Sequence, residues 1–400
     1  MNGRIGLALA GGGPEGAIYE IGALRALDDS IEGLDLNDLE VYVGVSAGAF
    51  IAANLANRLT PAQMCRAIVK TEPGEHPFIP ETFLQPALKE IARQGIQFPK
   101  LMIDGLREAA AHPEDPGIGD TLVRLSRALP VAVLDNEPIR AYLERIYTIK
   151  DRTDDFRELD RPLFVVATDL ETGRAVRFGE SDFRDVPIST AVQASTALPG
   201  LYPPVDVDGR YYVDGVLIKT LHASVALDHG VDLLFCINPI VPVDLHPGND
   251  GVPSGVLLDR GLPTVLSQTF RTLIHSRLVV GMKAYDGKYP SDVVLFEPRR
   301  DDYRMFFTNI FSFSSRRTVC EHAYEVTRRQ LLRRREELEP ILEGLGLRLR
   351  VDRLEDPGRN LWRGLGMDEE GREVAHRRTL DRLSRSLDRV EDLLRRRESS

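Results

Sequence analysis

The sequence predicts an α/β fold with a mainly parallel sheet, because strand and helix patterns alternate through its first 60 residues. Residues 5–11 (IGLALAG) form an apolar run typical of a buried strand, and residues 17–29 carry apolar side chains at helical spacing. Residues 39–44 (LEVYVG) predict a second strand, and residues 47–57 predict a second helix. Strand, helix, strand and helix in this order are typical of a parallel sheet covered by helices.

The length and composition are those of a globular protein with one large domain and appended helices. Its 400 residues are 42% hydrophobic, which allows a sizeable core. The 51 basic and 61 acidic residues give a net charge of −10, which argues against a nucleic-acid partner. No apolar run approaches the roughly 18 residues of a membrane-spanning helix, so we expect a cytoplasmic protein. Cys65, Cys236 and Cys320 have neither disulfide nor metal-site spacing, and we expect no metal and no cofactor.

Beyond residue 60, local patterns predict a helical insertion and the rest of the sheet. Proline and glycine interrupt short helical fragments over about 61–150, which we assign to an insertion that covers the sheet. Thr60 and Pro61 are typical of a helix start. Apolar runs and turn residues predict strands at 162–170, 175–179, 209–215, 231–239 and 292–298, and a helix at 219–229 that ends at Gly230. A tight turn between the first two of these strands predicts a hairpin.

The domain organisation follows from these patterns and from a change of composition near residue 300. We expect a main domain over 1–300, an aromatic segment with an arginine-rich helix over 301–345, and a helical extension over 346–400. Residues 305–317 combine aromatic side chains with arginines, which is typical either of contact with a membrane interface or of packing in a core or lid. Leucine and valine recur in heptads over 380–394, which predicts either a homo-oligomer through helix pairing or one amphipathic helix folded onto the body.

The second predicted strand leads into a pattern typical of a nucleophilic serine. Gly44, Ser46 and Gly48 form G-x-S-x-G between a strand and a helix of small residues. In such a nucleophile elbow the serine lies on a strained turn, and the flanking glycines let the strand and the helix approach closely. The alternative is that these glycines serve helix–strand packing alone.

The glycine run after the first strand has two interpretations. Gly11, Gly13 and Gly16 satisfy the G-x-G-x-x-G spacing of a dinucleotide site. That site also requires an acidic residue at the end of the second strand, where this chain has the Ser46 elbow. The backbone amides of Gly11, Gly12 and Gly13 at a helix N-terminus suit the oxyanion that forms when a serine attacks an ester. We therefore predict an oxyanion hole here.

An aspartate and four histidines are candidates for the base that activates Ser46. Asp214 ends a predicted strand and is followed by Gly215, so its carboxylate can project at the same sheet edge as Ser46. To act as a base it would need a pKa raised by desolvation or a tight proton transfer within a water-poor site, and an Asp-Gly turn is also a common connection. A hydrolase with a Ser-Asp-His triad would use a downstream histidine instead. The histidines are His222, His229, His246 and His275, of which we expect the first two to be surface or capping residues on one helix.

These motifs resemble the patatin-like phospholipase family. The matching stretches are AGGGPEG, GVSAG, VVATDLETG, ASTALPGLYPPV and VDGV, in the family's order over about 4–240. The resemblance implies a three-layer α/β/α fold and hydrolysis of lipid acyl esters by a Ser-Asp dyad without histidine. It implies Ser46 as the nucleophile, Asp214 as the base, and the amides of Gly12 and Gly13 as oxyanion donors.

Two positions depart from the family's pattern. The family usually has a basic residue where this chain has Glu15, and a small residue where it has Val216. A carboxylate at position 15 would disfavour an anionic head group or weaken oxyanion stabilisation, unless Lys219, Arg174 or Arg210 restores positive potential. We expect a serine esterase or phospholipase with a lipid or other acyl-ester substrate. The alternatives are a catalytically impaired binding or regulatory protein with this fold, and a histidine-based α/β-hydrolase.

Overall fold

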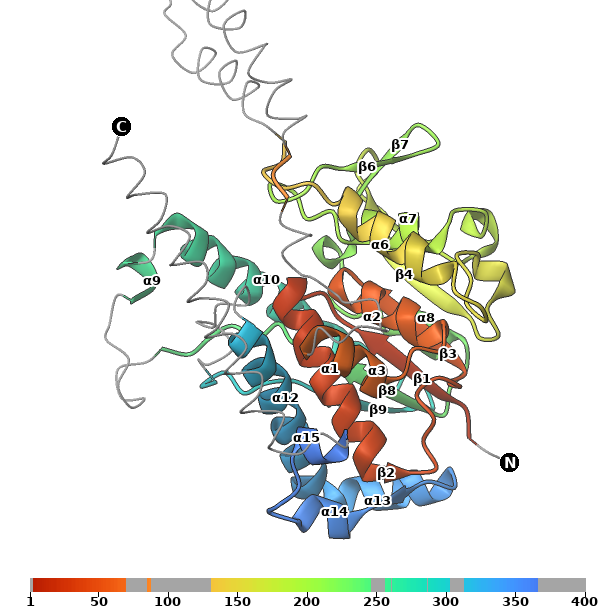
Figure 1. Ribbon diagram of the computed structural model, residues 1–400, viewed down its shortest axis with the longest axis vertical. Coiled ribbons are helices and arrows are strands. Elements are labelled where there is room, and N and C mark those ends of the chain that lie inside the picture. The colour runs from red at the N-terminus through yellow and green to blue at the C-terminus, as the bar shows by residue number, and fades with distance from the viewer. Residues whose placement is uncertain are drawn as a thin grey trace, which may run out of the picture.

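A mixed, mainly parallel sheet of eight strands forms the centre of the molecule (Figure 1), which confirms the predicted fold class. Its strand order is β6 (Val205–Val207), β7 (Arg210–Asp214), β4 (Leu163–Asp169), β3 (Val41–Val45), β1 (Ile5–Leu9), β8 (Leu233–Ile237) and β9 (Asp292–Phe296), and β5 (Ala175–Phe178) pairs with β4. The strands from β4 to β9 in this order run parallel, whereas β5, β6 and β7 pair antiparallel. The hairpin of β4 and β5 is confirmed.

The computed structural model describes residues 3–69, 85–87, 131–245, 256–259, 261–285, 287–302 and 313–365. Most of the predicted insertion over 61–150 and most of the aromatic segment over 305–317 lie outside these residues. The predicted heptads over 380–394 and His246 also lie outside them. In the part of the chain that is described, no helix is long and apolar enough to cross a membrane.

Two hydrophobic cores lie on opposite faces of the sheet because successive side chains of a strand point to opposite sides. Leu7 and Leu9 belong to one core, and Ala8 and Ala10 belong to the other. The first core is covered by α1 (Gly13–Ser30), α2 (Ala47–Ala56), α7 (Ile188–Ser195) and α12 (Phe313–Arg333). The second is covered by α8 (Ser224–Asp228) and α10 (Leu262–Tyr285). The result is helices, sheet and helices in three layers.

Six further described helices precede α12 in the chain. They are α3 (Pro61–Val69), η2 (Phe156–Glu158), α6 (Glu137–Tyr147), η3 (Ser181–Phe183), η4 (Gly215–Leu217) and α9 (Val256–Asp259). The predicted start of α3 is confirmed, because Thr60 and Gln63 exchange hydrogen bonds of 2.9 and 3.2 Å between side chain and backbone in a capping arrangement.

The predicted helix over 219–229 is wrong in extent. The chain forms η4 directly after β7, and α8 begins only at Ser224. His222, with a φ of 46°, lies in the left-handed region and separates the two helices. Gly230, with a φ of 72°, ends this region as expected. The sequence showed no sign of this interruption because apolar spacing continues through it.

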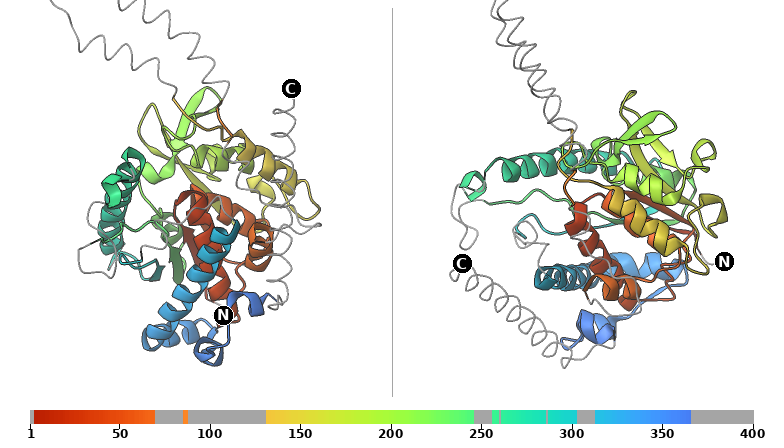
Figure 2. Two further views of the ribbon diagram at one scale, coloured as in Figure 1. Left: turned by 60° about the vertical axis from the view of Figure 1, so that its left-hand side comes forward. Right: turned by 45° about the horizontal axis from the view of Figure 1, so that its top comes forward.

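The C-terminal helices are confirmed, and they lie against α1. α12 runs beside α1 in both orientations of Figure 2, and a Cβ at Gly22 would lie 2.2 Å from the carbonyl oxygen of Cys320. The predicted arginine-rich helix is divided into α12 and α13 (Arg335–Gly344). It is interrupted at Arg334, whose guanidinium binds the Leu295 carbonyl of β9 at 3.0 Å, a tertiary contact that helical periodicity does not predict.

The last described elements fasten the C-terminal part to the end of α1. β2 (Ile31–Glu32) pairs antiparallel with β10 (Arg348–Leu349), and α14 (Val351–Glu355) and α15 (Leu361–Gly364) follow. Asp29 near the end of α1 hydrogen-bonds to side chains from α12 and from the segment around α14.

Candidate active site

Ser46 lies on the sharp turn between β3 and α2. Its φ of 54° and ψ of −122° are unusual for a residue with a Cβ, and the side chain is almost fully buried. Its backbone N–H donates to Ser195 Oγ at 2.8 Å, and Ser195 Oγ donates to the Val166 carbonyl at 2.6 Å. This buried chain of hydrogen bonds holds the strained turn against β4.

The two glycines around Ser46 allow α2 to lie close to the strands. A Cβ at Gly44 would come 2.5 Å from Ala49 Cα, and a Cβ at Gly48 would come 2.5 Å from the carbonyl carbon of Leu9. Both distances are far below van der Waals contact, so neither position accepts a side chain without movement of the backbone. The Gly48 N–H also donates to the Ala10 carbonyl at 3.0 Å, which joins the turn to the glycine loop after β1.

Asp214 is the buried carboxylate that lies next to Ser46. It ends β7, is 2% exposed, accepts a hydrogen bond from the Val216 N–H at 2.9 Å, and lies beside the Ser46 side chain. Burial raises its pKa to about 7, although the Ser46 side chain and the Val216 N–H favour the charged form and lower it. A carboxyl group in this environment exchanges a proton near neutral pH. Gly215 follows it in the turn, where a Cβ would lie 2.3 Å from the Val166 carbonyl oxygen.

The glycine loop passes beside Ser46 and begins α1. A Cβ at Gly11 would lie 3.1 Å from the Cβ of Ser46. Gly13 has a φ of 60°, which favours glycine, and α1 starts there after the extended Gly12. The Gly16 N–H donates to the Gly12 carbonyl at 3.0 Å, whereas amides before it belong to the first turn, which has no intrahelical acceptors. The positive end of an 18-residue helix therefore lies beside the serine.

Glu15 is paired with an arginine from a distant part of the chain. The carboxylate lies in the first turn of α1, and its Oε2 is 3.5 Å from Nη2 of Arg271 on α10. Burial raises the pKa of Glu15 to about 7, and the charge of Arg271 opposes that rise. Burial lowers the pKa of Arg271, and Glu15 opposes that change. Lys219, Arg174 and Arg210 were the predicted compensating charges, whereas the charge beside Glu15 belongs to Arg271 on α10, a helix that was not predicted.

α10 is anchored to the segments that follow β7 and β8. The Gln268 side chain donates to the Val243 carbonyl at 2.7 Å and accepts from the Val243 N–H at 3.1 Å. The Thr220 hydroxyl donates to the Ile274 carbonyl at 3.3 Å. These contacts lie on either side of Arg271 and hold α10 across the side of the site. Its outer surface exposes apolar side chains at Leu262, Leu266, Phe270, Leu273 and Val280.

The described histidines make contacts with residues other than Ser46. His222 is buried rather than on the surface, and its Nε2 lies 3.4 Å from the Gly215 carbonyl. Burial lowers its pKa to about 4, so the ring is neutral near pH 7. His229 lies at the end of α8 with Nδ1 2.9 Å from the Val225 carbonyl, as expected of a capping residue. His275 lies 3.6 Å from Glu297.

The predicted site residues therefore fall into one cluster, and one residue of that cluster had no predicted role. The structure brings together Ser46, Asp214 and the glycine loop. Ser195 supports the Ser46 backbone. The only sequence signal for this role was its position in the family-like stretch ASTALPG. Within the described ranges, no group of three or more histidine, cysteine or acidic side chains is arranged to hold a metal ion.

Comparison with known proteins gives the family of the chain. Residues 7–227, more than half of the chain, match the family model for patatin-like phospholipases. The chain therefore belongs to the patatin-like phospholipase family, as its motifs predicted. Members of this family are generally serine acyl hydrolases, and lipid or other acyl esters are the substrates that it implies.

Individual relatives match over part of their length. The chain is 31% identical over 97 residues to the uncharacterized NTE family proteins Rv1063c of Mycobacterium tuberculosis and Mb1092c of Mycobacterium bovis. Each match covers 24% of this chain and 25% of the relative. Among solved structures, VipD from Legionella pneumophila is similar at a TM-score of 0.37 and 16% identity, over 82% of this chain and 66% of VipD. The type III effector protein ExoU is similar at a TM-score of 0.35 and 14% identity, over 83% of this chain and 53% of ExoU.

Proposed function

We propose that this protein is a lipid acyl hydrolase in which Ser46 is the nucleophile and Asp214 is the base. The observation that carries the proposal is that the Ser46 side chain lies beside the buried carboxylate of Asp214 and lowers its pKa. The glycine loop at the N-terminus of α1 lies beside the same serine, so a nucleophile, a base and oxyanion donors occupy one edge of the sheet. Membership of the patatin-like phospholipase family supports the same chemistry.

The first half of the reaction forms an acyl-enzyme. The Ser46 hydroxyl oxygen attacks the carbonyl carbon of the ester while its proton passes to the Asp214 carboxylate. The negative charge on the carbonyl oxygen is stabilised by the amides of Gly12 and Gly13, which the positive end of α1 reinforces. When the intermediate collapses, the ester C–O bond breaks and the leaving alcohol takes the proton from Asp214. An acyl ester of Ser46 remains.

The second half of the reaction restores the enzyme. Asp214 accepts a proton from a water molecule as that water attacks the acyl carbon, and the same amides stabilise the second oxyanion. Collapse breaks the bond to Ser46 and releases the carboxylic acid, and Asp214 returns the proton to the serine. A pKa near 7 suits both proton transfers because a catalytic group works best when its pKa lies near the operating pH.

The Glu15–Arg271 pair supports an active enzyme over a catalytically impaired protein. A lone carboxylate in the first turn of α1 would oppose a developing oxyanion. The guanidinium of Arg271 lies against that carboxylate and offsets its charge. We infer that the departure from the family's pattern at position 15 is compensated by α10 and does not by itself remove activity.

The test is reaction of the full-length protein with a fluorophosphonate probe, together with hydrolysis of p-nitrophenyl esters of graded chain length. We expect the wild type to be labelled once and to hydrolyse at least one ester, and Ser46→Ala to do neither. Ser276→Ala is the matched control, because Ser276 lies exposed on α10, and it should behave as the wild type. A folded wild type that resists the probe and is no faster than Ser46→Ala on every ester would instead support a binding or regulatory protein.

A further inference from the structure

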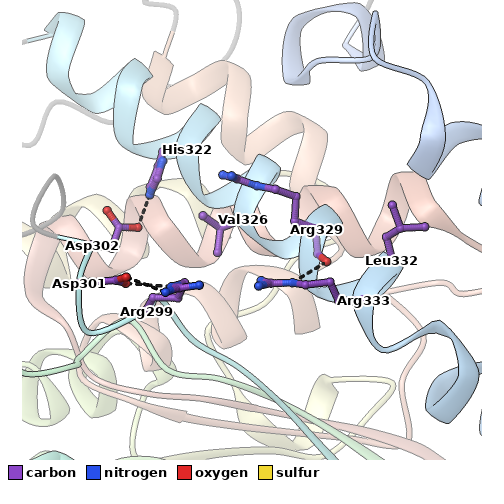
Figure 3. A pocket seen from close by; sticks show the side chains of 8 residues that line it. All are labelled: Arg299, Asp301, Asp302, His322, Val326, Arg329, Leu332 and Arg333. Carbon is purple, nitrogen blue, oxygen red and sulfur yellow. Dashed lines mark hydrogen bonds and ion pairs between the residues drawn. The ribbon is translucent and has the colours of Figure 1, made fainter. Parts of the chain in front are cut away.

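A separate pocket of about 470 Å³ lies between α12 and the loop that follows β9 (Figure 3). It shares no lining residue with the Ser46 site. Its walls combine charged and apolar side chains, which are Arg299, Asp301, Asp302, His322, Val326, Arg329, Leu332 and Arg333. This volume is in the range of pockets that bind small molecules.

Both acidic side chains of the pocket are already bound to basic neighbours. Arg299 donates two hydrogen bonds to Asp301, from Nε at 2.8 Å and from Nη2 at 2.6 Å. His322 on α12 is hydrogen-bonded to Asp302. Figure 3 shows both pairs at one side of the hollow. Asp301 is therefore paired with a cation, and Asp302 has a hydrogen-bond partner within the pocket.

Arg329 and Arg333 leave positive charge without a carboxylate beside it. The Nε of each donates at 3.3 Å to the backbone carbonyl four residues earlier on α12. Both side chains line the pocket, their guanidinium ends extend toward other lining residues in Figure 3, and both are exposed to solvent. Within the described ranges no acidic side chain binds either residue. The two like charges stand one helical turn apart, where they repel each other.

The neighbouring arginines differ from Arg329 and Arg333 because each of them binds a group outside its own helical turn or a carboxylate. Arg328 donates to backbone carbonyls of the C-terminal segment, including that of Arg359 at 2.8 Å. Arg334 binds the Leu295 carbonyl, and Arg335 binds Glu339 at 2.7 Å. Arg328 and Arg334 therefore join separate segments of the chain, Arg335 makes a pair within α13, and Arg329 and Arg333 line the pocket.

The chemistry of the pocket matches a phosphate group attached to an organic body. Guanidinium groups bind phosphate oxygens through paired N–H donors, and Val326 and Leu332 supply an apolar wall beside them. The net charge of the chain is −10, so a positive pocket here is a local feature and not a consequence of overall composition. We propose that this pocket binds a phosphate monoester, either a free metabolite or a lipid head group, through Arg329 and Arg333.

The test measures binding by full-length Ser46→Ala protein, so that ester hydrolysis does not interfere and failure of the proposed function does not affect the result. Calorimetric titration with glycerol 3-phosphate covers a free ester. Flotation with phosphatidylcholine vesicles, with and without phosphatidic acid, covers a lipid head group. The pocket variant is Arg329→Gln/Arg333→Gln. The control is Arg335→Gln/Arg348→Gln, which removes the same charge from exposed positions outside the pocket.

We expect binding by the parent protein, at least a tenfold loss in the pocket variant, and less than a twofold change in the control. Binding of glycerol 3-phosphate would identify a free ester, and binding only to vesicles with phosphatidic acid would identify a head group. Equal losses in both variants would overturn the proposal, because they would show general charge attraction. So would full binding by the pocket variant, or no binding of either ligand by the parent protein. Thermal unfolding of each variant checks that the fold is retained.

Discussion

Two buried aspartates in this molecule have the same solvent exposure, but their pKa values are shifted in opposite directions. Asp29 and Asp214 are each 2% exposed. Burial would raise the pKa of Asp29, but hydrogen bonds from Arg359 and Tyr324 and the charge of Arg25 hold it at about 2. Burial raises the pKa of Asp214 to about 7, since only neutral donors oppose it. Charged partners at Asp29, which Asp214 lacks, hold the carboxylate in its ionised form.

The two environments correspond to two roles. Asp29 receives hydrogen bonds from Arg353 at 2.9 Å and from Tyr324 at 2.7 Å, and thereby joins α1 to α12 and α14. A permanently charged carboxylate suits such a junction. Asp214 lies beside a serine hydroxyl and accepts a hydrogen bond from one backbone amide, and a carboxylate that exchanges its proton near neutral pH suits a base. Substitution of each aspartate should therefore separate activity from stability.

The largest expected effect is on activity, in Asp214→Asn. The amide keeps the shape of the side chain but cannot accept a proton, so kcat/KM should fall by about 10²- to 10⁴-fold. Thermal stability should stay equal or rise, because the substitution removes a desolvated acid. Steady-state kinetics and thermal unfolding of the same preparation measure both. A variant that keeps most of its kcat/KM would rule out Asp214 as the base.

The next effect is on stability, in Asp29→Asn. This change leaves the guanidinium groups of Arg25, Arg353 and Arg359 around a neutral amide, and breaking such a buried network costs about 3 kcal/mol. Activity per folded molecule should be unchanged. Asp28→Asn is the matched control, because Asp28 is more exposed and pairs with one arginine, and it should cost less than about 1 kcal/mol. Denaturant unfolding compares the two, and equal losses would contradict a special role for Asp29.

A smaller effect is expected at Arg271. In Arg271→Gln the Glu15 carboxylate loses the charge that lowers its pKa, so at alkaline pH, where Glu15 is ionised, kcat should fall by about tenfold, since a lost oxyanion donor costs more than this. The double variant Glu15→Gln/Arg271→Gln should recover most of the loss, because no charge then remains. KM should change less than kcat, since the ground-state ester carries no oxyanion. Failure of the second substitution to restore kcat would mean that Arg271 acts through α10 packing alone.

The fold and the local motifs could be predicted from the sequence, because each depends on neighbouring residues. Gly44 and Gly48 are required by the approach of a helix to a strand, and Asp214 ends an apolar strand. The partner of Glu15 could not be predicted, since Arg271 belongs to a distant helix with no motif of its own. The prediction that His222 and His229 share a helix was wrong because the backbone at His222 turns left-handed.

A further effect concerns pH, where the two aspartates should act in different ranges. Activity should rise as Asp214 loses its proton, about tenfold per pH unit below 7 and level above it. The folded pKa of Asp214 exceeds its ordinary value of 3.8, so its contribution lowers stability as pH rises from about 4 to 7. The contribution of Asp29 to stability changes with pH in the opposite direction. Its folded pKa lies below 3.8, so its stabilising contribution is present above pH 4 and is lost as pH falls toward 2.

Glu15 titrates in the same range as Asp214 and must be separated from it, because burial also raises its pKa to about 7. Glu15→Gln should keep the rise of kcat/KM through pH 7 if Asp214 is the titrating base. Thermal unfolding of Asp214→Asn between pH 4 and 8 should show a weaker loss of stability with rising pH than the wild type. A pH–activity profile that flattens in Glu15→Gln would assign the titration to Glu15 and leave Asp214 without a demonstrated proton transfer.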